Sequence, residues 1–450
     1  MRGAEYERLV RRFFSLEKRG MKLSLDGTRS LLKKIGKPER NFFSVLVGGT
    51  NGKGSTCSLI ASIAKAAGYR VGLYTSPHLI DFRERIRISG ECIDKDDARE
   101  LLRFLVPIAE KGGYSFFETV TALAFRHFKD KNVELVVAEV GLGGRLDSTN
   151  VLSPLVSVIT GIGIEHSHIL GASLRAIATE KAGIARKDRP IVTGSQGVAL
   201  ETIRRISASL GSRLFVVGKD VGLRSRFVSR AGTVFSASGN VQFDNAQSGD
   251  PRSALVHRGN TRTIDLYLRL RGKHQIRNAG CALLACSNLR NYGFKIRREA
   301  VETGLRDAEW PGRLEEWGWR PLVLFDVAHN PQAGAVLSEA LATIYRGKRV
   351  VAVVGMVEDK DHRKFLKRLL PRVRHVVFTQ ASTPRALPAH ELKDRMPSGF
   401  SRWSVREGLR QALEEAFSIA DDDELVCVTG SFYTVGEAMD CLGIDVRESI

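Results

Sequence analysis

One stretch, Val45-Leu46-Val47-Gly48-Gly49-Thr50-Asn51-Gly52-Lys53-Gly54-Ser55-Thr56, constrains the fold of this chain more than any other. The apolar run that enters it has the length of a buried strand, and residues 57–67 have the pattern of a helix, so the glycines fall at a strand-to-helix turn. At such a turn backbone N–H groups and the positive helix end converge, and glycines let a polyphosphate approach the backbone. The stretch therefore predicts a phosphate-binding loop, in which Lys53 supplies a charge and Ser55 or Thr56 a hydroxyl toward Mg²⁺.

The spacing of this loop departs from the common Walker pattern, which has a glycine five residues before its last glycine and Ser or Thr directly after the lysine. Val47 stands in the first of these places, and Gly54 is inserted after Lys53. A glycine-rich turn that binds nothing is the alternative. The strand, the lysine, the hydroxyls and the helix fall together as such a motif requires, and this context favours phosphate binding.

Length and charge restrict the classes of partner. The 450 residues suggest two or three domains, and we expect two. There are 69 Lys and Arg against 50 Asp and Glu, a net charge of +19, which suits nucleotides, polycarboxylates or nucleic acid. Residues 362–370 place basic side chains opposite an apolar face, without interleaved aromatic residues for base stacking, so part of this charge is ordinary solvated surface.

Cysteine spacing and hydropathy predict a reduced, cytoplasmic protein. The six cysteines form no CxxC pair. Residues 1–14 are rich in Arg and Glu and have no apolar signal segment, and nowhere do 18 apolar residues run together. We therefore expect neither an export signal nor a membrane span.

The amino-terminal part has the pattern of a parallel sheet. Apolar strands at 134–140 and 155–160 run into glycine-rich polar tips, as the first strand does, and helices separate most of the strands. This pattern is typical of a parallel sheet whose carboxyl edge carries the site. Residues 226–269 alternate in short stretches and predict antiparallel strands, with a flexible portion near 244–260.

Strand–helix alternation restarts at Pro321, and strands are expected at 322–327, 350–354, 375–379 and 424–429. The predicted fold class is α/β. It comprises a P-loop ATPase-like domain with a mostly parallel sheet at 1–307 and a smaller Rossmann-like α/β domain at 308–450.

Polar residues at the strand tips suggest a metal site beside the loop. Glu139 and His166 end two neighbouring predicted strands, and with the hydroxyls of Ser76 and Ser55 they would surround a γ-phosphate with ligands that suit Mg²⁺. Each residue alone is more often structural. Lys181, on a predicted helix, would by itself be an ordinary surface lysine.

An ordered series of motifs resembles the folylpolyglutamate synthase and dihydrofolate synthase family, within the larger Mur ligase group. The motifs span residues 48–330, and nine in one order are highly specific. They are Gly-Thr-Asn-Gly-Lys-Gly-Ser at 49–55, Thr-Ser-Pro-His-Leu at 75–79 with Glu-Arg-Ile at 84–86, Phe-Glu at 117–118, Glu-Val-Gly-Leu-Gly-Gly-Arg-Leu-Asp at 139–147, His166, Glu-Lys-Ala-Gly-Ile at 180–184, His274-Gln275 with Asn278, Trp-Pro-Gly-Arg at 310–313 and Asp-Val-Ala-His-Asn at 326–330.

The resemblance implies an ATP-dependent amide ligase that phosphorylates a substrate carboxylate and then joins it to L-glutamate. It implies catalytic roles for Lys53, Lys181 and His329, with Lys181 carbamylated, and two Mg²⁺ sites. The implied ATP-binding residues are Thr50, Asn51, Gly52, Lys53, Gly54, Ser55, Thr56, Asn278, Arg313 and Asp326. The implied metal ligands are Ser76, Glu139, His166 and Ser55. The implied folate or pterin contacts are Phe117, Asp147 and Arg85.

The substrates expected from the resemblance are ATP, L-glutamate and dihydropteroate or a reduced folate, for a monomer that binds neither nucleic acid nor membrane. A bifunctional enzyme is the leading hypothesis, and a monofunctional folylpolyglutamate synthase is the alternative. Arg83 replaces an asparagine common in bacterial members, which leaves the shape of its loop open. A P-loop ATPase stimulated by nucleic acid would explain the net charge, but not the cluster of Arg313, Asp326 and His329.

Overall fold

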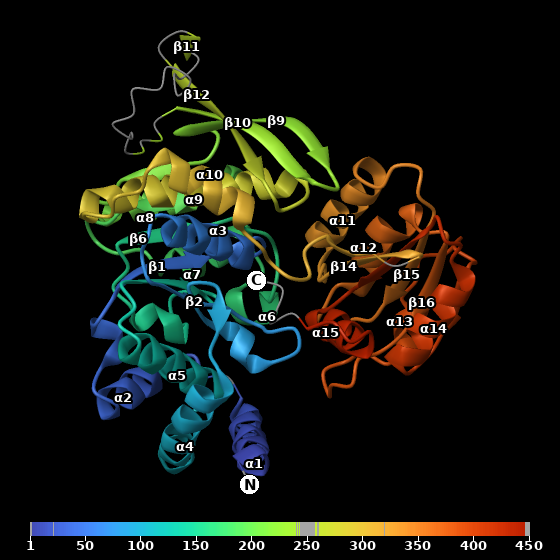
Figure 1. The fold of residues 1–450 in the computed structure, drawn as a ribbon, viewed down its shortest axis with the longest axis horizontal. Coiled ribbons are helices and arrows are strands. Elements are labelled where there is room, and N and C mark those ends of the chain that lie inside the picture. The colour runs from blue at the N-terminus through green and yellow to red at the C-terminus, as the bar shows by residue number, and fades with distance from the viewer. Residues whose placement is uncertain are drawn as a thin grey trace.

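The computed structural model describes residues 2–20, 22–239, 241, 243, 257–258, 261–318 and 320–445. Figure 1 shows a larger amino-terminal part, coloured blue to yellow, beside a smaller carboxyl-terminal part, coloured orange to red. Sheets of eight, four and six strands organise the described chain. The predicted α/β fold class with a mostly parallel amino-terminal sheet is confirmed.

The eight-stranded sheet places the phosphate loop near its centre. Its strands are β1 (Phe43–Gly48), β2 (Val71–Tyr74), β3 (Ile86–Ile88), β4 (Glu91–Cys92), β5 (Leu135–Glu139), β6 (Val156–Ile159), β7 (Ile191–Thr193) and β8 (Leu214–Val216). The order is β4-β3-β2-β5-β1-β6-β7-β8, and the pairs β2–β3 and β3–β4 are antiparallel while the others are parallel. Because β1 lies between β5 and β6, the carboxyl ends of these three strands meet at one edge.

Helices cover both faces of this sheet (Figure 1). One face carries α3 (Lys53–Ala66), α9 (Lys273–Leu289) and α10 (Arg298–Asp307). The other carries α1 (Arg2–Ser15), α2 (Asp26–Lys34), α4 (Lys95–Gly112), α5 (Phe116–Asp130), α7 (Leu174–Ala182) and α8 (Gly197–Ser209), with the short α6 (Ser167–Leu170) before α7. Val45 and Val47 of β1 pack into the first core and Leu46 into the second, as the two-residue period of a strand requires.

A four-stranded antiparallel sheet packs beside α9. It contains β9 (Val221–Ser229), β10 (Gly232–Gly239), β11 (His257–Arg258) and β12 (Thr261–Leu268), in the order β11-β12-β10-β9. Antiparallel strands were predicted here. The flexible portion predicted near 244–260 lies outside the described residues, apart from the two residues of β11.

The carboxyl-terminal part is a six-stranded sheet between two layers of helices. Its strands are β13 (Glu315–Trp317), β14 (Leu322–Asp326), β15 (Val350–Val354), β16 (His375–Phe378), β17 (Trp403–Val405) and β18 (Leu425–Thr429), in the order β13-β14-β18-β15-β16-β17 with antiparallel β13 at one edge. One layer contains α11 (Pro331–Thr343), α12 (His362–Leu369) and α13 (Ala389–Asp394), and the other contains α14 (Leu409–Ile419) and α15 (Phe432–Cys441).

The structure differs from the sequence predictions at the start of one helix and at two short edge strands. The helix expected at 57–67 begins earlier, at Lys53, because left-handed Gly52 caps it directly after the loop. The edge strands β13 and β17, three residues each, were not predicted, since so short a strand carries almost no periodicity.

No helix in the described chain is both long and apolar enough to cross a membrane.

Candidate active site

The glycine-rich loop follows β1 at the carboxyl edge of the large sheet. Gly52 has a φ of 83°, in the left-handed region. A Cβ at Gly52 would lie 2.3 Å from Asn278 Oδ1, and one at Gly49 would lie 1.9 Å from the Thr160 hydroxyl oxygen. That hydroxyl donates to the carbonyl of Asn51 at 2.8 Å and so ties the loop to the end of β6. Close approach therefore requires glycine at both positions.

Glu139, the last residue of β5, faces the loop lysine. Its Oε1 lies 3.8 Å from Lys53 Nζ, and its Oε2 accepts a hydrogen bond of 3.2 Å from the main-chain N–H of Ser76. Burial raises the pKa of the Glu139 carboxyl, and the positive charge of Lys53 opposes that rise. Three residues that are far apart in the sequence thus meet beside the loop.

The hydroxyls at the start of α3 differ in their surroundings. Ser55 accepts a hydrogen bond of 3.3 Å from Gln275 Nε2, and Gln275 Oε1 accepts one of 2.8 Å from Asn278 Nδ2. The Thr56 hydroxyl is buried and has no hydrogen-bond partner among the described residues. The loop therefore offers α3 hydroxyls and a chain of amides from α9.

The side chains beside the loop suit a hard cation whose other ligands are phosphate and water. In the part of the chain that the structure describes, no three His, Cys, Asp or Glu side chains come together as a metal cage. Glu139 and the Ser76 segment supply few oxygen ligands, which is the usual arrangement for Mg²⁺ beside a polyphosphate.

His166 follows the end of β6 and has a φ of 51°. Its Nδ1 lies 3.8 Å from an Asp359 carboxylate oxygen, and its Nε2 lies 3.9 Å from Glu165 Oε1. Burial and the nearby charge of Lys360 lower the pKa of His166 to about 4. The imidazole is therefore neutral at pH 7, which is the form that can bind a metal ion.

Lys181 of α7 reaches back to the phosphate loop. Its Nζ donates to the carbonyl of Gly49 at 2.8 Å, and the side chain is buried. Burial is the main cause that lowers the pKa of Lys181 to about 7, and repulsion from the charge of Lys53 adds to it. Near neutral pH a large fraction of this amine is uncharged, and an uncharged amine is the nucleophilic form.

The end of β14 brings the carboxyl-terminal part to the same place. Asp326 accepts main-chain N–H groups of Leu314 (3.0 Å) and Ala328 (2.9 Å), so its carboxylate fixes the turns on both sides of the strand. The Arg313 guanidinium lies over the Phe432 ring, 5.0 Å from the ring centroid. Burial lowers the pKa of Arg313, and the negative charge of Asp326 opposes that shift. These contacts hold Arg313 as a cation stacked on an aromatic ring.

Polar side chains join the two parts directly at the loop. Asn330 Nδ2 donates to Asn51 Oδ1 at 2.9 Å, and Asn51 Nδ2 donates to Gln332 Oε1 at 3.3 Å. Because Asn51 belongs to the phosphate loop, any rearrangement of the two parts must break contacts made by the loop itself.

Glu165 has a place in the site that the sequence did not reveal. Its Oε1 lies 3.0 Å from Lys360 Nζ and 3.3 Å from His329 Nε2, both in the carboxyl-terminal part. Burial raises the pKa of Glu165, but the His329 hydrogen bond and the charges of His329 and Lys360 outweigh it and hold the pKa below its ordinary value. Its only sequence signal was its position beside His166 at a strand tip.

His329 is held from two sides. Its Nδ1 lies 2.8 Å from the carbonyl oxygen of Val327, and its Nε2 faces Glu165. An imidazole that is protonated on both nitrogens satisfies both acceptors. His329 therefore lies at the meeting point of the two parts, within 3.3 Å of the Glu165 carboxylate.

The three residues expected at the pterin differ in their contacts. The ring of Phe117 fills the space over Gly141, where a Cβ would lie 2.4 Å from it. Asp147 accepts the main-chain N–H groups of Leu142 (2.9 Å) and Thr149 (3.0 Å), so its carboxylate shapes the loop after β5, and burial raises its pKa.

Arg85 lies over the ring of Phe116, the residue before Phe117, and its Nε donates to His78 Nδ1 at 2.8 Å. The neighbouring Arg83 pairs with Asp81 at 2.8 Å. This ion pair shows how the loop accommodates the arginine whose effect on its shape the sequence left open.

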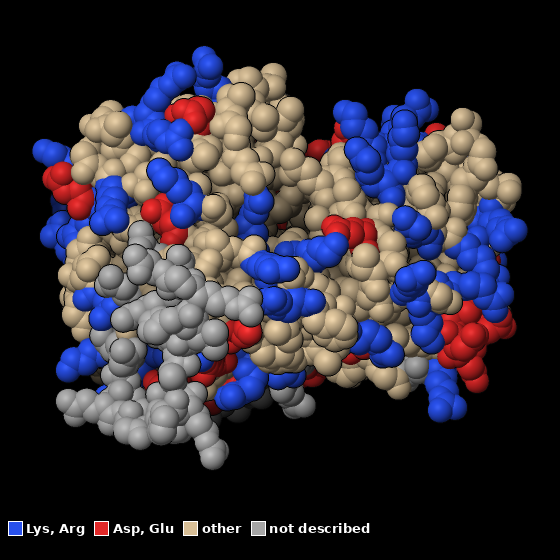
Figure 2. Space-filling model, turned by 90° about the horizontal axis from the view of Figure 1, so that it is seen from above, with Lys and Arg blue, Asp and Glu red and all other residues tan. Residues whose placement is uncertain are grey.

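Positive side chains surround the approach to the site. Figure 2 shows a depression between the two parts of the molecule, with Lys and Arg side chains on both sides and fewer acidic ones. With a net charge of +19, this distribution favours the approach of anionic substrates.

Two protein families match the chain. "Mur ligase middle domain" matches residues 47–286, and "Mur ligase, glutamate ligase domain" matches residues 312–432. The phosphate loop, the parallel sheet and the second α/β unit that closes on them thus define a Mur ligase.

Individual relatives identify the family within the Mur ligases to which the chain belongs. A Bacillus subtilis dihydrofolate synthase/folylpolyglutamate synthase is 34% identical over 93% of this chain and 94% of its own length. A probable bifunctional folylpolyglutamate synthase/dihydropteroate synthase of Haloferax volcanii is 36% identical over 96% of this chain, which spans about half (50%) of that relative. The chain belongs to the folylpolyglutamate synthase/dihydrofolate synthase family, as its motifs predicted.

Solved structures agree with this assignment. Escherichia coli FolC in complex with DHPP and ADP has a TM-score of 0.81 and 30% identity, with 97% of each chain covered. A bifunctional folylpolyglutamate synthase/dihydrofolate synthase with Mn, AMPPNP and L-glutamate bound has a TM-score of 0.80 and 31% identity, covering 97% of this chain and 98% of that one.

Proposed function

We propose that this protein is an ATP-dependent amide ligase that adds L-glutamate to dihydropteroate and to the glutamate tail of reduced folates. The observation that carries the proposal is the convergence of the phosphate loop, the Lys53–Glu139 pair and the side chains of Arg313 and His329 at one junction. The relatives with bound nucleotide, metal, L-glutamate and DHPP support it.

The reaction needs charge compensation more than acid–base chemistry. The substrate carboxylate attacks the γ-phosphorus of ATP and ADP leaves, so two anions must approach each other. Lys53 lies at the phosphate loop, and Arg313 faces it from the other part, so both reduce this repulsion. The glutamate nitrogen then attacks the acyl carbon, phosphate leaves, and the nitrogen loses a proton.

The contacts between the two parts exclude water from the acyl phosphate. Asn51 with Asn330, and Glu165 with Lys360, close the junction directly over the loop. An acyl phosphate is short-lived in water, so closure protects it until the amine arrives. We assign the two parts to residues 1–307 and 308–450.

The finer cofactor assignments rest on the motif resemblance. Ser55, Ser76, Glu139 and His166 would hold Mg²⁺, in two sites, and the metal supplies further compensation of phosphate charge. Lys181, buried beside Gly49, would react with CO₂ as a free amine to give a carbamate, a carboxylate-like group directed at the phosphates. Thr50, Gly54, Thr56, Asn278 and Asp326 would shape the nucleotide site, and Phe117, Asp147 and Arg85 the pterin and folate sites.

Release of ADP with two acceptor substrates tests the proposal. Purified protein with Mg²⁺, ATP and L-glutamate should release ADP when either dihydropteroate or tetrahydrofolate is added, and each product should gain the mass of one glutamate residue. Omitting glutamate should abolish product.

Each outcome of that assay is informative. Turnover with tetrahydrofolate alone would indicate a monofunctional folylpolyglutamate synthase. ADP release that depends on nucleic acid and ignores glutamate would replace the proposal with a P-loop ATPase. No glutamate-dependent release with either acceptor would contradict the proposed function.

A further inference from the structure

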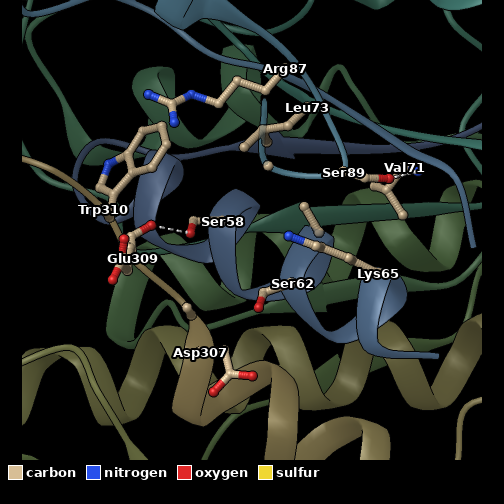
Figure 3. A pocket seen from close by; sticks show the side chains of 13 residues that line it. Ser58, Ser62, Lys65, Val71, Leu73, Arg87, Ser89, Asp307, Glu309 and Trp310 are labelled. Carbon is tan, nitrogen blue, oxygen red and sulfur yellow. Dashed lines mark hydrogen bonds between the residues drawn. The ribbon is translucent and has the colours of Figure 1, made fainter. Parts of the chain in front are cut away.

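A pocket that the proposed reaction does not use lies beside α3, at the connection between the two parts. Figure 3 shows it between α3, the β2–β3 edge and the segment that follows α10. None of the residues assigned above to the nucleotide, the metal or the pterin lines it. Its walls are formed by Ser58, Ala61, Ser62, Lys65, Val71, Leu73, Arg87, Ser89, Gly90, Asp307, Ala308, Glu309 and Trp310.

Arg87 is a buried cation in this pocket with incomplete pairing. It is 2% exposed, and its Nε donates to the carbonyl of Glu84 at 3.1 Å. Its Nη1 is buried with no hydrogen-bond partner among the described residues, and the carboxylates of Glu84 and Glu309 attract the guanidinium without a described ion pair to it. A buried charge in this condition is costly, so an anionic partner would stabilise it.

Lys65 is a second cation on the same pocket. Its Nζ would lie 3.0 Å from a Cβ at Gly90, and the described residues form no ion pair with it. The two acidic side chains of the pocket are already paired: Asp307 with Arg306 at 3.0 Å, and Glu309 with Arg269. The pocket therefore presents one buried cation with an unused donor, Arg87, and one exposed cation, Lys65.

Hydroxyl groups complete the lining. Ser58 donates to the carbonyl of Glu309 at 2.7 Å, which Figure 3 marks, and Ser62 donates to the carbonyl of Gly304 at 2.8 Å. The cavity measures about 70 Å³. One water needs roughly 10–15 Å³ on this scale, so the cavity holds a few waters or one small ion, and a nucleotide or a pterin does not fit.

We propose that this pocket binds a small oxyanion, a carboxylate or a phosphate, between Arg87 and Lys65. Both groups accept charge-assisted hydrogen bonds from guanidinium and ammonium donors. The proposed reaction consumes a free carboxylic acid, L-glutamate, and releases phosphate, so both kinds of anion are present during turnover.

Trp310 contacts both the pocket and the phosphate loop. The indole lies against the start of α3, because a Cβ at Gly54 would lie 2.7 Å from Trp310 Nε1. Ala308, Glu309 and Trp310 lead from α10 toward the carboxyl-terminal part. An anion between Arg87 and Lys65 lies beside this connection, so its binding changes the surroundings of the Trp310 indole.

Fluorescence of Trp310 tests the site without turnover. The full chain, saturated with Mg²⁺ and ADP to occupy the phosphate loop, is titrated at constant ionic strength with inorganic phosphate and, in a second arm, with L-glutamate. We expect a saturable change in at least one arm, and its absence in Trp310→Phe. Lys65→Met should weaken binding about tenfold, because it removes one charge-assisted contact. Lys367→Met, on an exposed face of α12, is the matched control and should bind like the parent.

The two arms of the titration distinguish the two candidate anions. A response in the phosphate arm alone identifies the reaction product as the ligand, and one in the glutamate arm alone identifies the amino-acid substrate. No saturable response in either arm, or equal affinity in Lys65→Met and the parent, would overturn the proposal. Arg87→Lys, which keeps the buried charge, is expected to bind more weakly than the parent while remaining folded. The result does not depend on whether the proposed ligase reaction occurs.

Discussion

Burial decides the chemistry of single residues in this site. Lys181 has no described ion-pair partner, and its Nζ donates to the carbonyl of Gly49. The sequence suggested an ordinary surface lysine until the surrounding motif was considered, because desolvation cannot be read from one residue type. Glu165 shows the same limit, since its partners Lys360 and His329 are distant in sequence.

Replacement of Lys181 by alanine should lower the turnover number by about tenfold or more, since it removes a charged group that acts in a site shielded from water. If the working form is a carbamate, acetate or formate should partly restore turnover. The measurement is ADP release at saturating substrates, and Lys187→Ala, an exposed lysine nearby, is the control. Full activity in Lys181→Ala would contradict the carbamate.

The lowered pKa of Lys181 also predicts a pH dependence of stability. Its pKa falls from an ordinary value of 10.5 to about 7, so between these values the unfolded chain binds more protons than the folded chain. This lysine therefore makes the free energy of unfolding rise from pH 7 toward 10.5. Lys181→Met should gain most stability over the parent near pH 7 and less near pH 9.5, measured by urea unfolding. An equal difference at both pH values would exclude this pKa.

Glu165→Gln should impair closure of the junction between the two parts while leaving nucleotide binding nearly unchanged. The amide keeps the shape of the side chain but removes the negative charge that faces Lys360 and His329, so Lys360 keeps only Asp359, at 3.7 Å, as an acidic partner among the described residues. We expect turnover to fall about tenfold with little change in ADP affinity, and the double variant with Lys360→Met to lose less than the sum of the single losses. Strictly additive losses would show that the two residues are not coupled. Glu201→Gln, an exposed glutamate on α8, is the control.

At the scale of elements, the edge of the parallel sheet was predictable and the partners of its loops were not. Strands β1, β5 and β6 are apolar runs that end in glycine, and their adjacency follows from the α/β pattern. Each loop then packs against residues more than a hundred positions away, such as Gly163 against Gln332. Local periodicity contains no information on such distant pairs.

Gly163→Ala should disturb this packing at the junction. A Cβ there would lie 2.2 Å from Gln332 Oε1, so the Gln332 side chain must move from its place beside Asn51. We expect a loss of several-fold to tenfold in kcat/KM, since small displacements in a closed site are costly. Gly161→Ala, with open space at its Cβ position, is the control. Gln332→Ala in the Gly163→Ala background should recover activity, and no recovery would refute the clash.

At the scale of the whole molecule, strand–helix alternation predicted two α/β units, but not the contacts that hold them together. Those contacts are partly polar, such as Asn51 with Asn330, and partly apolar, such as Leu79 against the core of the carboxyl-terminal sheet, and each pairs residues that had no reason to be matched from sequence alone. The motif resemblance placed Arg313 and His329 at the site because they occur in a known order. Apart from Trp310, the residues that line the pocket at Arg87 belong to no motif, and the pocket became visible only in three dimensions.

The net charge of +19 predicts a dependence on ionic strength. Positive side chains on both sides of the depression attract ATP and folate substrates, which are anions, and salt screens that attraction over about 8 Å at physiological ionic strength. Between about 0.05 and 0.5 M NaCl, kcat/KM for the folate substrate should fall several-fold while kcat changes little, because encounter is screened and the buried pairs at the junction are not. Initial rates at each salt concentration, with Mg²⁺ and ATP saturating, provide the measurement. A fall in kcat with unchanged kcat/KM would place the effect of salt on closure instead of encounter.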